Sequence, residues 1–220
     1  MIKAFIFDID GTLIDSVDYH AEAWVKAFKK FGKNVKFYEA RRQVGKGGDQ
    51  FLPEFLLKKE IKEFGKAVED ERGKIFKSEF LPKIKPFPEV RELFEKIQTD
   101  GKQLVLASSA PADELKVYKK IANIEDLVDD ETSADDAEKS KPEPDIFQAA
   151  FDKLGKINKK NAVVVGDTAY DAEAAAKMNL RTIGVLTGGW TKSELLSAGC
   201  SEVYKDIAEI FADYKNVINS

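Results

Sequence analysis

The sequence predicts an α/β protein built on a doubly wound parallel sheet, with an α-helical domain inserted into it. Two patterns support this fold class. Short apolar runs recur along the chain, with amphipathic helical patterns between them. A strand covered on both faces is a continuous apolar run, so these runs indicate buried parallel strands. One long segment near the N-terminus breaks the alternation, because it carries helical patterns only.

Five apolar runs are the expected strands. They are AFIFD (4–8), QLVLAS (103–108), NAVVVGD (161–167), RTIGVL (181–186) and the short EVY (202–204). Helical spacing is expected at 88–101, 113–123, 144–155 and 171–178, and two of these helices end near a glycine. Strands that alternate with helices are typical of a sheet with helices on both of its faces.

The segment from residue 16 to about 85 has no convincing strand. Its amphipathic patterns predict a helical cap domain, and LPKIKPFP (81–88) is the expected hinge by which the chain returns. The prediction is therefore a core domain formed by 1–15 and 86–220, with a cap domain formed by 16–85. Within the cap, the stripe of Trp24, Phe28 and Phe31 indicates cap core in preference to a ligand site.

Composition narrows the function classes. The 39 acidic and 35 basic side chains are interleaved along the 220 residues, so no basic stripe indicates a nucleic-acid partner. The single cysteine, Cys200, excludes an internal disulfide and a cysteine-based zinc cluster. The apolar run at the N-terminus is too short for a signal peptide or a membrane span. We therefore expect a soluble cytoplasmic protein with no membrane partner, either a monomer or a small homo-oligomer.

Polar residues follow three of the expected strands, where a parallel sheet binds its ligands. They are Asp8 with Asp10, Ser108 with Ser109, and Asp167, with Asp171 one helical turn later. An aspartate before a glycine also simply ends many strands. Several carboxylates at one sheet edge repel one another, however, unless a cation or a proton is shared among them. A hard divalent ion with oxygen ligands, Mg²⁺ first, would relieve that repulsion.

Two further features suit a phosphate ligand. Lys141 lies in the loop before an expected helix, where it is either a surface charge or a group that neutralises a phosphate. Ser108 and Ser109, with free amides at a strand end, suit a phosphoryl oxygen, although a serine before a helix is more often only a cap. The prediction of a phosphate site depends on the combination of these residues.

Four sequence stretches, DIDGTLIDS, LASSA, KSKPEPDIF and GDTAYDAEAA, resemble the four motifs of the haloacid dehalogenase superfamily, in the right order. The resemblance covers nearly the whole chain and implies a Rossmann-like core. The helical segment after the first motif is similar to the small cap of the phosphoglycolate-phosphatase and β-phosphoglucomutase branch.

The resemblance also implies residue roles. Asp8 would be the nucleophile that forms an aspartyl phosphate, and Asp10 the general acid and base. Ser108 and Lys141 would bind the phosphoryl group. The metal ligands would be Asp167, the carboxylate of Asp8 and the main-chain carbonyl of Asp10, with Asp171 supporting the metal site.

Two features of the cap are candidates for substrate binding. His20 resembles a histidine of the β-phosphoglucomutases, so we expect it to contact Asp10 or the substrate, unless it is an ordinary half-buried histidine. The stretch VGKGGDQ (44–50) resembles the specificity loop of the family's cap in its position between two helices, where Gly45 and Lys46 would approach a substrate. A plain interhelical turn explains the same glycines.

These features predict a magnesium-dependent phosphatase that acts on a small sugar or organic-acid phosphate. The first alternative is a phosphomutase of the β-phosphoglucomutase kind, and the second a phosphate-binding or regulatory protein without turnover. Asp10 argues against a dehalogenase, because cleavage of a carbon–halogen bond needs no protonated leaving group. Phosphonate cleavage uses a cap lysine in one relative, and Lys26, Lys46 and Lys74 match that pattern only loosely.

Overall fold

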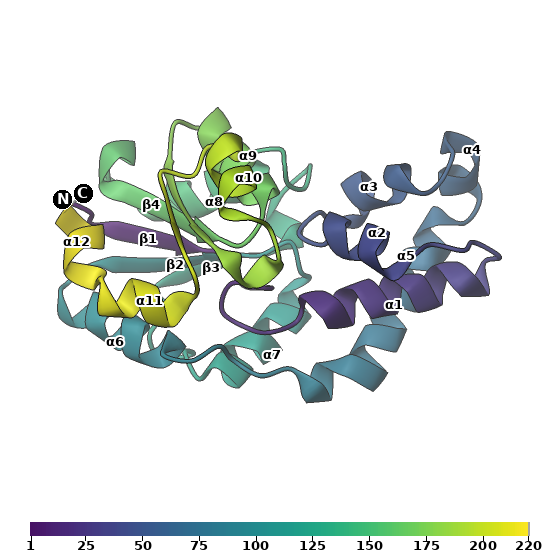
Figure 1. Cartoon of the computed structure of the whole chain (residues 1–220), viewed down its shortest axis with the longest axis horizontal. Helices are drawn as coiled ribbons and strands as arrows, with labels where there is room; N and C mark the ends of the chain where they lie inside the picture. The colour runs from purple at the N-terminus through teal and green to yellow at the C-terminus, as the bar shows by residue number, and fades with distance from the viewer. Residues whose placement is uncertain (220) are drawn as a thin grey trace.

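A computed structural model describes residues 1–219 and shows one six-stranded sheet in which every neighbouring pair of strands is parallel (Figure 1). The strand order is β3-β2-β1-β4-β5-β6. The strands are β1 (Ala4–Phe7), β2 (Gln103–Ala107), β3 (Asp130–Thr132), β4 (Ala162–Gly166), β5 (Arg181–Val185) and β6 (Glu202–Tyr204). The order reverses at β1, the position in a doubly wound sheet where ligands bind beyond the carboxyl ends of the strands. The predicted fold class is confirmed.

Helices cover both faces of the sheet. The core-side helices are α6 (Val90–Thr99), α7 (Ala112–Ala122), α8 (Asp145–Lys153), α9 (Ala169–Lys177), α10 (Lys192–Ala198), α11 (Ile207–Ala212) and α12 (Tyr214–Asn219). One apolar cluster joins α6, α7, α11 and α12 to Phe5 and Phe7 of β1. A second joins α8 and α9 to Ala4 and Ile6, which alternate with those phenylalanines along the strand. The two-residue period of a strand therefore supplies both cores from one apolar run.

The helical insertion, residues 17–83, follows β1. It contains α1 (Val17–Lys30), α2 (Phe37–Gln43), α3 (Gly48–Phe51), α4 (Lys58–Glu60) and α5 (Lys66–Ile75), with short 3₁₀ turns at Leu52–Glu54 and Leu81–Lys83. Wider π-helical turns at Ile61–Gly65 and Phe76–Phe80 flank α5. Figure 1 shows these helices gathered at one end of the molecule, beyond the carboxyl end of β1.

Aromatic packing holds the helical insertion together. The Trp24 ring stacks on Phe51 with centroids 4.2 Å apart, and Phe28 lies beside both rings. Phe31 is only partly buried and packs against Phe64. Trp24 and Phe28 of the expected stripe therefore lie in the apolar core of the insertion, and Phe31 lies at the margin of that core.

Two short backbone segments connect the helical insertion to the sheet. The amide of Asp15 donates to the carbonyl of Lys85 at 2.9 Å, and the amide of Phe87 donates to the carbonyl of Leu13 at 3.0 Å. The outgoing and returning chains thus run side by side. The division into a core of 1–15 and 86–220 and a cap of 16–85 remains a prediction.

Four elements were not expected from the sequence: β3 and the helices α10, α11 and α12. The strand β3 has the sequence DET and pairs with β2 at the edge of the sheet. An edge strand with one neighbour does not need the apolar run that identifies a buried strand. No helix within residues 1–219 has the length and apolar character needed to cross a bilayer.

Candidate active site

The end of β1 places Asp8 beside the neighbouring strand β4. The amide of Asp8 donates to the carbonyl of Val165, which continues the sheet one residue past the strand. Gly11, with φ of +84°, then turns the chain, and the Thr12 hydroxyl comes within 3.1 Å of Asp8 Oδ2 and 3.2 Å of Asp167 Oδ1. A tight turn thus brings the carboxylates of two strands to one hydroxyl.

Lys141 lies at the centre of the acidic group and is 1% exposed. Its Nζ is 2.5 Å from Asp8 Oδ1 and 2.8 Å from Asp171 Oδ1. The other oxygen of Asp171 accepts hydrogen bonds from the amide and hydroxyl of Thr168, which caps α9. The reading of Lys141 as a surface charge is therefore wrong, because the lysine is buried between two carboxylates.

Three buried carboxylates, those of Asp8, Asp167 and Asp171, offer oxygens that lie within 4.8 Å of one another. Within residues 1–219, Oδ2 of Asp167 is buried and has no hydrogen-bond partner. A Cβ on Gly11 or Gly188 would lie 2.3 or 2.1 Å from that oxygen, so both glycines leave it room. A buried carboxylate oxygen without a partner, in a set of hard oxygen donors, fits a divalent cation such as Mg²⁺.

The pKa shifts of the clustered residues also fit a bound divalent cation. Burial, together with the nearby Asp171, raises the pKa of Asp8 to about 7, against the opposing effect of Lys141. Burial, with Asp8 and Asp171 nearby, raises the pKa of Asp167 well above its ordinary value. The pKa of Lys141 is raised, because the attraction of Asp171 and Asp8 outweighs burial. One lysine thus offsets only part of the charge of three buried acids.

Asp10 faces the helical insertion. Its Oδ1 accepts from the Ser16 hydroxyl at 2.6 Å and lies 2.8 Å from His20 Nε2. Burial alone would raise the pKa of Asp10, but His20, Ser16 and Arg72 together hold it below the ordinary value. The expected contact between His20 and Asp10 is confirmed.

The His20 ring is fixed by two neighbours. It stacks on Phe76 with centroids 3.9 Å apart. Its Nε2 is also 3.5 Å from the hydroxyl of Tyr118, which donates to Glu114 Oε2 at 3.2 Å. Tyr118 and Glu114 lie on α7, so His20 is packed on Phe76 of the insertion and contacts the sheet domain through Asp10 and Tyr118.

The serines after β2 differ in part from expectation. The amide of Ser108 donates to the carbonyl of Thr132 at 3.0 Å, so the prediction of a free amide there is wrong. The missed strand β3 supplies that carbonyl. The Ser108 hydroxyl accepts from the amide of Ala110, as in a local turn. The Ser109 hydroxyl is 3.5 Å from the carbonyl of Gly45, which brings the expected loop of the insertion to the sheet.

Lys46 is held by the insertion itself. Its Nζ donates to Gln43 Oε1 at 2.6 Å and to Glu54 Oε1 at 2.8 Å, and it lies over the ring of Tyr170. Lys26 pairs with Glu79 at the surface. These contacts compensate the charge of both lysines. The substrate-binding role expected for Lys46 and Gly45 stays a prediction.

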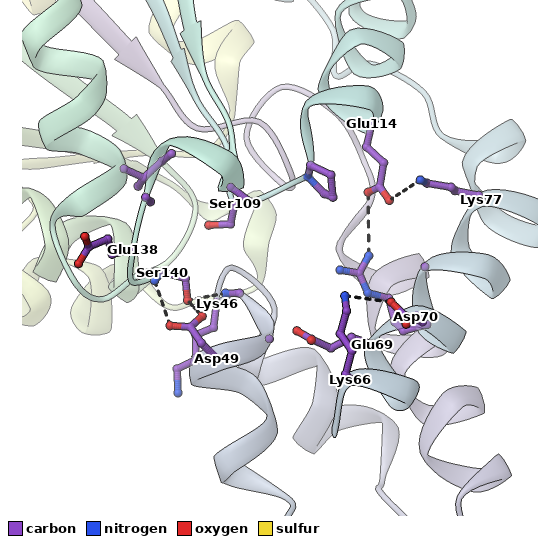
Figure 2. A pocket seen from close by; sticks show the side chains of 18 of the residues that line it. Lys46, Asp49, Lys66, Glu69, Asp70, Lys77, Ser109, Glu114, Glu138 and Ser140 are labelled. Atoms are coloured by element: carbon purple, nitrogen blue, oxygen red, sulfur yellow. Dashed lines mark hydrogen bonds and ion pairs between the residues drawn. The ribbon is translucent and has the colours of Figure 1, made fainter. Parts of the chain in front are cut away.

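Two connected spaces lie between the helical insertion and the sheet. A narrow hollow is lined by Asp8, Asp10, His20 and Ser109, among others. A wide cavity of about 650 Å³ adjoins it and is bounded by α5 on one side and by the loops after β2 and β3 on the other (Figure 2). Lys46, Arg72, Ser109 and Glu114 line both spaces.

Sequence reasoning missed four residues at this site: Thr12, Arg72, Glu114 and Tyr118. Thr12 lies inside the first motif and could have been included. Arg72, in the stretch DERGK, and Glu114, in DELKV, lie in ordinary amphipathic helices among other charges. Local sequence did not distinguish them, because only the docking of the insertion on the sheet brings them to the hollow.

Several known proteins are similar to this chain in sequence and in fold. The sequence profile of the haloacid dehalogenase-like hydrolases matches residues 2–179. The protein SUPPRESSOR OF QUENCHING 1, chloroplastic, of Arabidopsis thaliana is 34% identical over 218 residues, which are 95% of this chain but only 20% of that protein. A phosphorylated carbohydrates phosphatase of Thermotoga maritima is 30% identical over 209 residues, covering 93% of this chain and 94% of the relative. The crystal structure of a hydrolase from Pseudomonas syringae superposes with a TM-score of 0.88 at 26% identity, covering 97% of this chain and 98% of that one.

Proposed function

Because this chain belongs to the haloacid dehalogenase-like hydrolases, we propose that it hydrolyses a small phosphate ester through an aspartyl phosphate formed on Asp8. The enzyme class is a phosphatase, in agreement with the Thermotoga maritima relative that matches over almost the full length of both chains. One observation supports the mechanism most directly. The buried carboxylate of Asp8 ends the central strand with the ammonium of Lys141 only 2.5 Å away.

The proposed reaction has two steps. In the first, an oxygen of Asp8 attacks phosphorus, the bond from phosphorus to the ester oxygen breaks, and the leaving alkoxide takes a proton from Asp10. In the second, water attacks the phosphorus of the aspartyl phosphate, the bond from phosphorus to the Asp8 oxygen breaks, and the water gives a proton to Asp10. Inorganic phosphate leaves, and both carboxyl groups return to their starting states.

The environment of Asp10 suits both halves of this role. Without substrate its pKa is held below the ordinary value, so the group is ionised, as a base must be. A phosphate dianion that enters beside Asp10 brings like charge, which raises the pKa of a carboxyl group and favours proton uptake. His20, 2.8 Å away, keeps Oδ1 of Asp10 fixed in the hollow.

Mg²⁺ is the proposed metal, and the buried oxygen donors are the observation that supports it. Asp8, Asp167 and the main-chain carbonyl of Asp10 would hold the ion. Asp171 would support the site from its place between Thr168 and Lys141. When bound, the ion would neutralise the phosphoryl charge and allow the clustered acids to ionise together.

Lys141 and Ser108 are the proposed phosphoryl-binding pair. Lys141 already compensates Asp8 and Asp171, so it holds the nucleophile in place before a phosphate enters. Ser108 follows β2, the strand next to β1, and its hydroxyl is buried beside the amide of Ala110. Charge neutralisation and positioning are the main requirements of phosphoryl transfer.

We assign residues 16–85 to a cap that closes over the leaving group of the substrate. The contacts of Gly45 with Ser109 and of His20 with Asp10 support this assignment, because both join the segment to residues that follow strands of the sheet. A sugar or short organic-acid phosphate is the proposed substrate class, and the carbohydrate-phosphate specificity of the Thermotoga maritima relative supports it.

A direct assay tests this function. The purified protein should release phosphate from p-nitrophenyl phosphate with Mg²⁺, and EDTA should stop the release. Asp8→Asn should abolish turnover, while Asp15→Asn, at an exposed position seven residues later, should retain it. If neither p-nitrophenyl phosphate nor a panel of metabolite phosphates is hydrolysed by the parent protein, a phosphate-binding protein without turnover is the better reading.

A phosphomutase is the second candidate, because His20 contacts Asp10 as the resemblance to β-phosphoglucomutases predicts. The two activities leave different products. Incubation with glucose 1-phosphate and a trace of glucose 1,6-bisphosphate should yield free phosphate and glucose if the protein is a phosphatase. Glucose 6-phosphate with little free phosphate would replace the phosphatase proposal with the mutase.

A further inference from the structure

Arg72 of α5 carries hydrogen-bond donors that the protein does not use. Its Nε and Nη1 atoms are buried and have no hydrogen-bond partner within residues 1–219. The nearest carboxylate oxygen, Oε2 of Glu114, is 4.0 Å from Nη1, which is beyond hydrogen-bond distance. A buried donor without a partner is costly, so its presence in a packed site needs a reason.

Glu114 does not supply that reason. Its Oε2 already accepts from Tyr118 at 3.2 Å, and Lys77 approaches its Oε1 at 3.7 Å. The guanidinium of Arg72 is instead positioned by an aromatic ring, because its central carbon lies 5.2 Å from the centre of the Trp24 ring. Such a ring fixes the plane of the guanidinium and leaves its N–H groups free to bind.

The location of Arg72 indicates what it could bind. It lines the narrow hollow together with Asp8 and Asp10, and it lines the wide cavity as well. A group bound to Arg72 would therefore lie in the same hollow as the proposed nucleophile. Because Arg72 lines both spaces, a substrate with its phosphoryl group at Asp8 and its other end toward the wide cavity would pass Arg72.

Most of the other cations around the wide cavity are already paired. Lys46 contacts Glu54 at 2.8 Å, Lys66 contacts Asp70 at 3.0 Å, and Lys77 contacts Asp113 at 2.7 Å. Figure 2 shows Lys66 beside Asp70 on the insertion, and Lys77 directed toward Glu114. Lys74 also lines the wide cavity, but it is not among the residues that line the hollow.

We propose that Arg72 binds a second oxyanion of the substrate, a carboxylate or a second phosphate, while the phosphoryl group to be transferred lies at Asp8. The guanidinium fork matches either oxyanion with two parallel hydrogen bonds. The preferred substrates are therefore small phosphate esters that carry another negative group. This inference rests on the proposed phosphatase function and narrows its substrate class.

Matched pairs of substrates test the inference on the unmodified protein. For the carboxylate, 2-phosphoglycolate is compared with 2-hydroxyethyl phosphate, and for the second phosphate, glucose 1,6-bisphosphate is compared with glucose 1-phosphate. We expect kcat/KM to be about ten- to a hundredfold higher for the doubly anionic member of at least one pair. The pair that shows the preference identifies the oxyanion. Equal values within both pairs would overturn the inference.

Variants then test whether Arg72 causes the preference for a second oxyanion. Arg72→Gln should reduce the ratio of kcat/KM between the doubly anionic substrate and its counterpart to within about threefold of one, mostly through a higher KM for the doubly anionic substrate. Arg72→Lys, which keeps the charge but loses the fork, should give an intermediate value. Lys66→Gln is the matched control, because it removes one positive charge from the same helix at a side chain that is 82% exposed. It should leave the preference unchanged.

The failures of the two proposals differ. If the parent protein hydrolyses p-nitrophenyl phosphate but does not favour a second oxyanion, only the role of Arg72 is wrong. If Arg72→Gln lowers the rates for both members of a pair equally, Arg72 acts on the fold or on Asp10, and the inference is also wrong. If the parent protein hydrolyses no phosphate ester, the proposed function itself fails.

Discussion

His20 Nε2 lies 2.8 Å from Asp10 Oδ1, a contact that joins the first helix of the insertion to the end of the central strand. The two residues belong to segments that must meet for the hollow to close. Stacking on Phe76 orients the histidine from within the insertion, and Tyr118 approaches from α7. The geometry of the proposed acid–base residue therefore depends on how the insertion docks on the sheet.

Replacement of His20 by Asn should lower kcat by about ten- to a hundredfold with a small change in KM. The loss is expected because Asp10 would no longer be held toward the leaving group, whereas the phosphoryl site at Asp8 and Lys141 would be intact. Steady-state kinetics with p-nitrophenyl phosphate measure it. Tyr118→Phe is the control, since it removes the 3.5 Å contact with His20 and the hydrogen bond to Glu114 but leaves the contact between His20 and Asp10, and its kcat should stay within about threefold of the parent. A parent-like kcat in His20→Asn would contradict a role for this contact.

Lys141→Met should abolish activity and destabilise the protein more at pH 8 than at pH 5.5. Without the ammonium, Asp8 and Asp171 lose their buried counter-charge, so the ionisation of Asp8 at high pH becomes more costly in the folded protein. Removal of one partner from a buried ion pair costs about 3–5 kcal/mol. Urea unfolding at the two pH values measures the difference. The exposed Lys139→Met should be neutral at both, and an equal loss at the two pH values for Lys141→Met would show that packing dominates.

The parts of the fold and site that the sequence predicted are those encoded in contiguous residues. The run before Asp8 is apolar because β1 is buried on both faces, and the acids follow it because the ligand site begins where the strand ends. The same reasoning located Asp167, whereas Lys141 was noted in the loop before an expected helix and its role came from the resemblance of KSKPEPDIF. Strand β3 was missed because an edge strand with the sequence DET has no apolar run. The carbonyl of Thr132 in that strand, which accepts from the Ser108 amide, was therefore not expected either.

Residues whose role depends on how the insertion packs on the sheet could not be predicted from the sequence in the same way. Arg72 and Glu114 are separated by about forty residues and lie on α5 and α7, with 4.0 Å between their charged groups. In the sequence each is one charge among many on an amphipathic helix, and such charges are mostly solvated. Only the tertiary arrangement shows that the Nε and Nη1 atoms of Arg72 are buried without a hydrogen-bond partner within residues 1–219.

Stabilisation by Mg²⁺ should grow as the pH rises from 5.5 to 8. The pKa of Asp8, about 7 in the folded protein, exceeds its ordinary value of 3.8. Its contribution to stability is therefore full below about pH 4 and is lost as the pH rises through 7. The metal requires ionised carboxylates, so it restores more stability where Asp8 would otherwise be an uncompensated charge.

Thermal unfolding with and without Mg²⁺ measures this effect. At pH 8 and a hundredfold excess over Kd, the gain should be about 2.7 kcal/mol, on the order of 5–10 °C in Tm. At pH 5.5 the shift should be clearly smaller. Asp167→Asn, which removes a proposed ligand, should show little shift at either pH. A shift of the same size at both pH values in the parent protein would exclude ionisation-linked binding at this cluster.

Gly188→Ala should remove the response to Mg²⁺ and lower kcat/KM by at least about a hundredfold, although the protein should still fold. The new Cβ would lie 2.1 Å from Asp167 Oδ2 and 2.6 Å from the main-chain oxygen of the same residue, so the carboxylate must move. Overpacking of this kind costs about 1–3 kcal/mol, and displacement of a metal ligand costs far more in rate. Gly73→Ala is the matched control, because no atom lies within 4 Å of its new Cβ and alanine favours the interior of α5 by about 1 kcal/mol. That variant should keep the Mg²⁺-induced rise in Tm, whereas an undiminished rise in Gly188→Ala would place the ion away from Asp167.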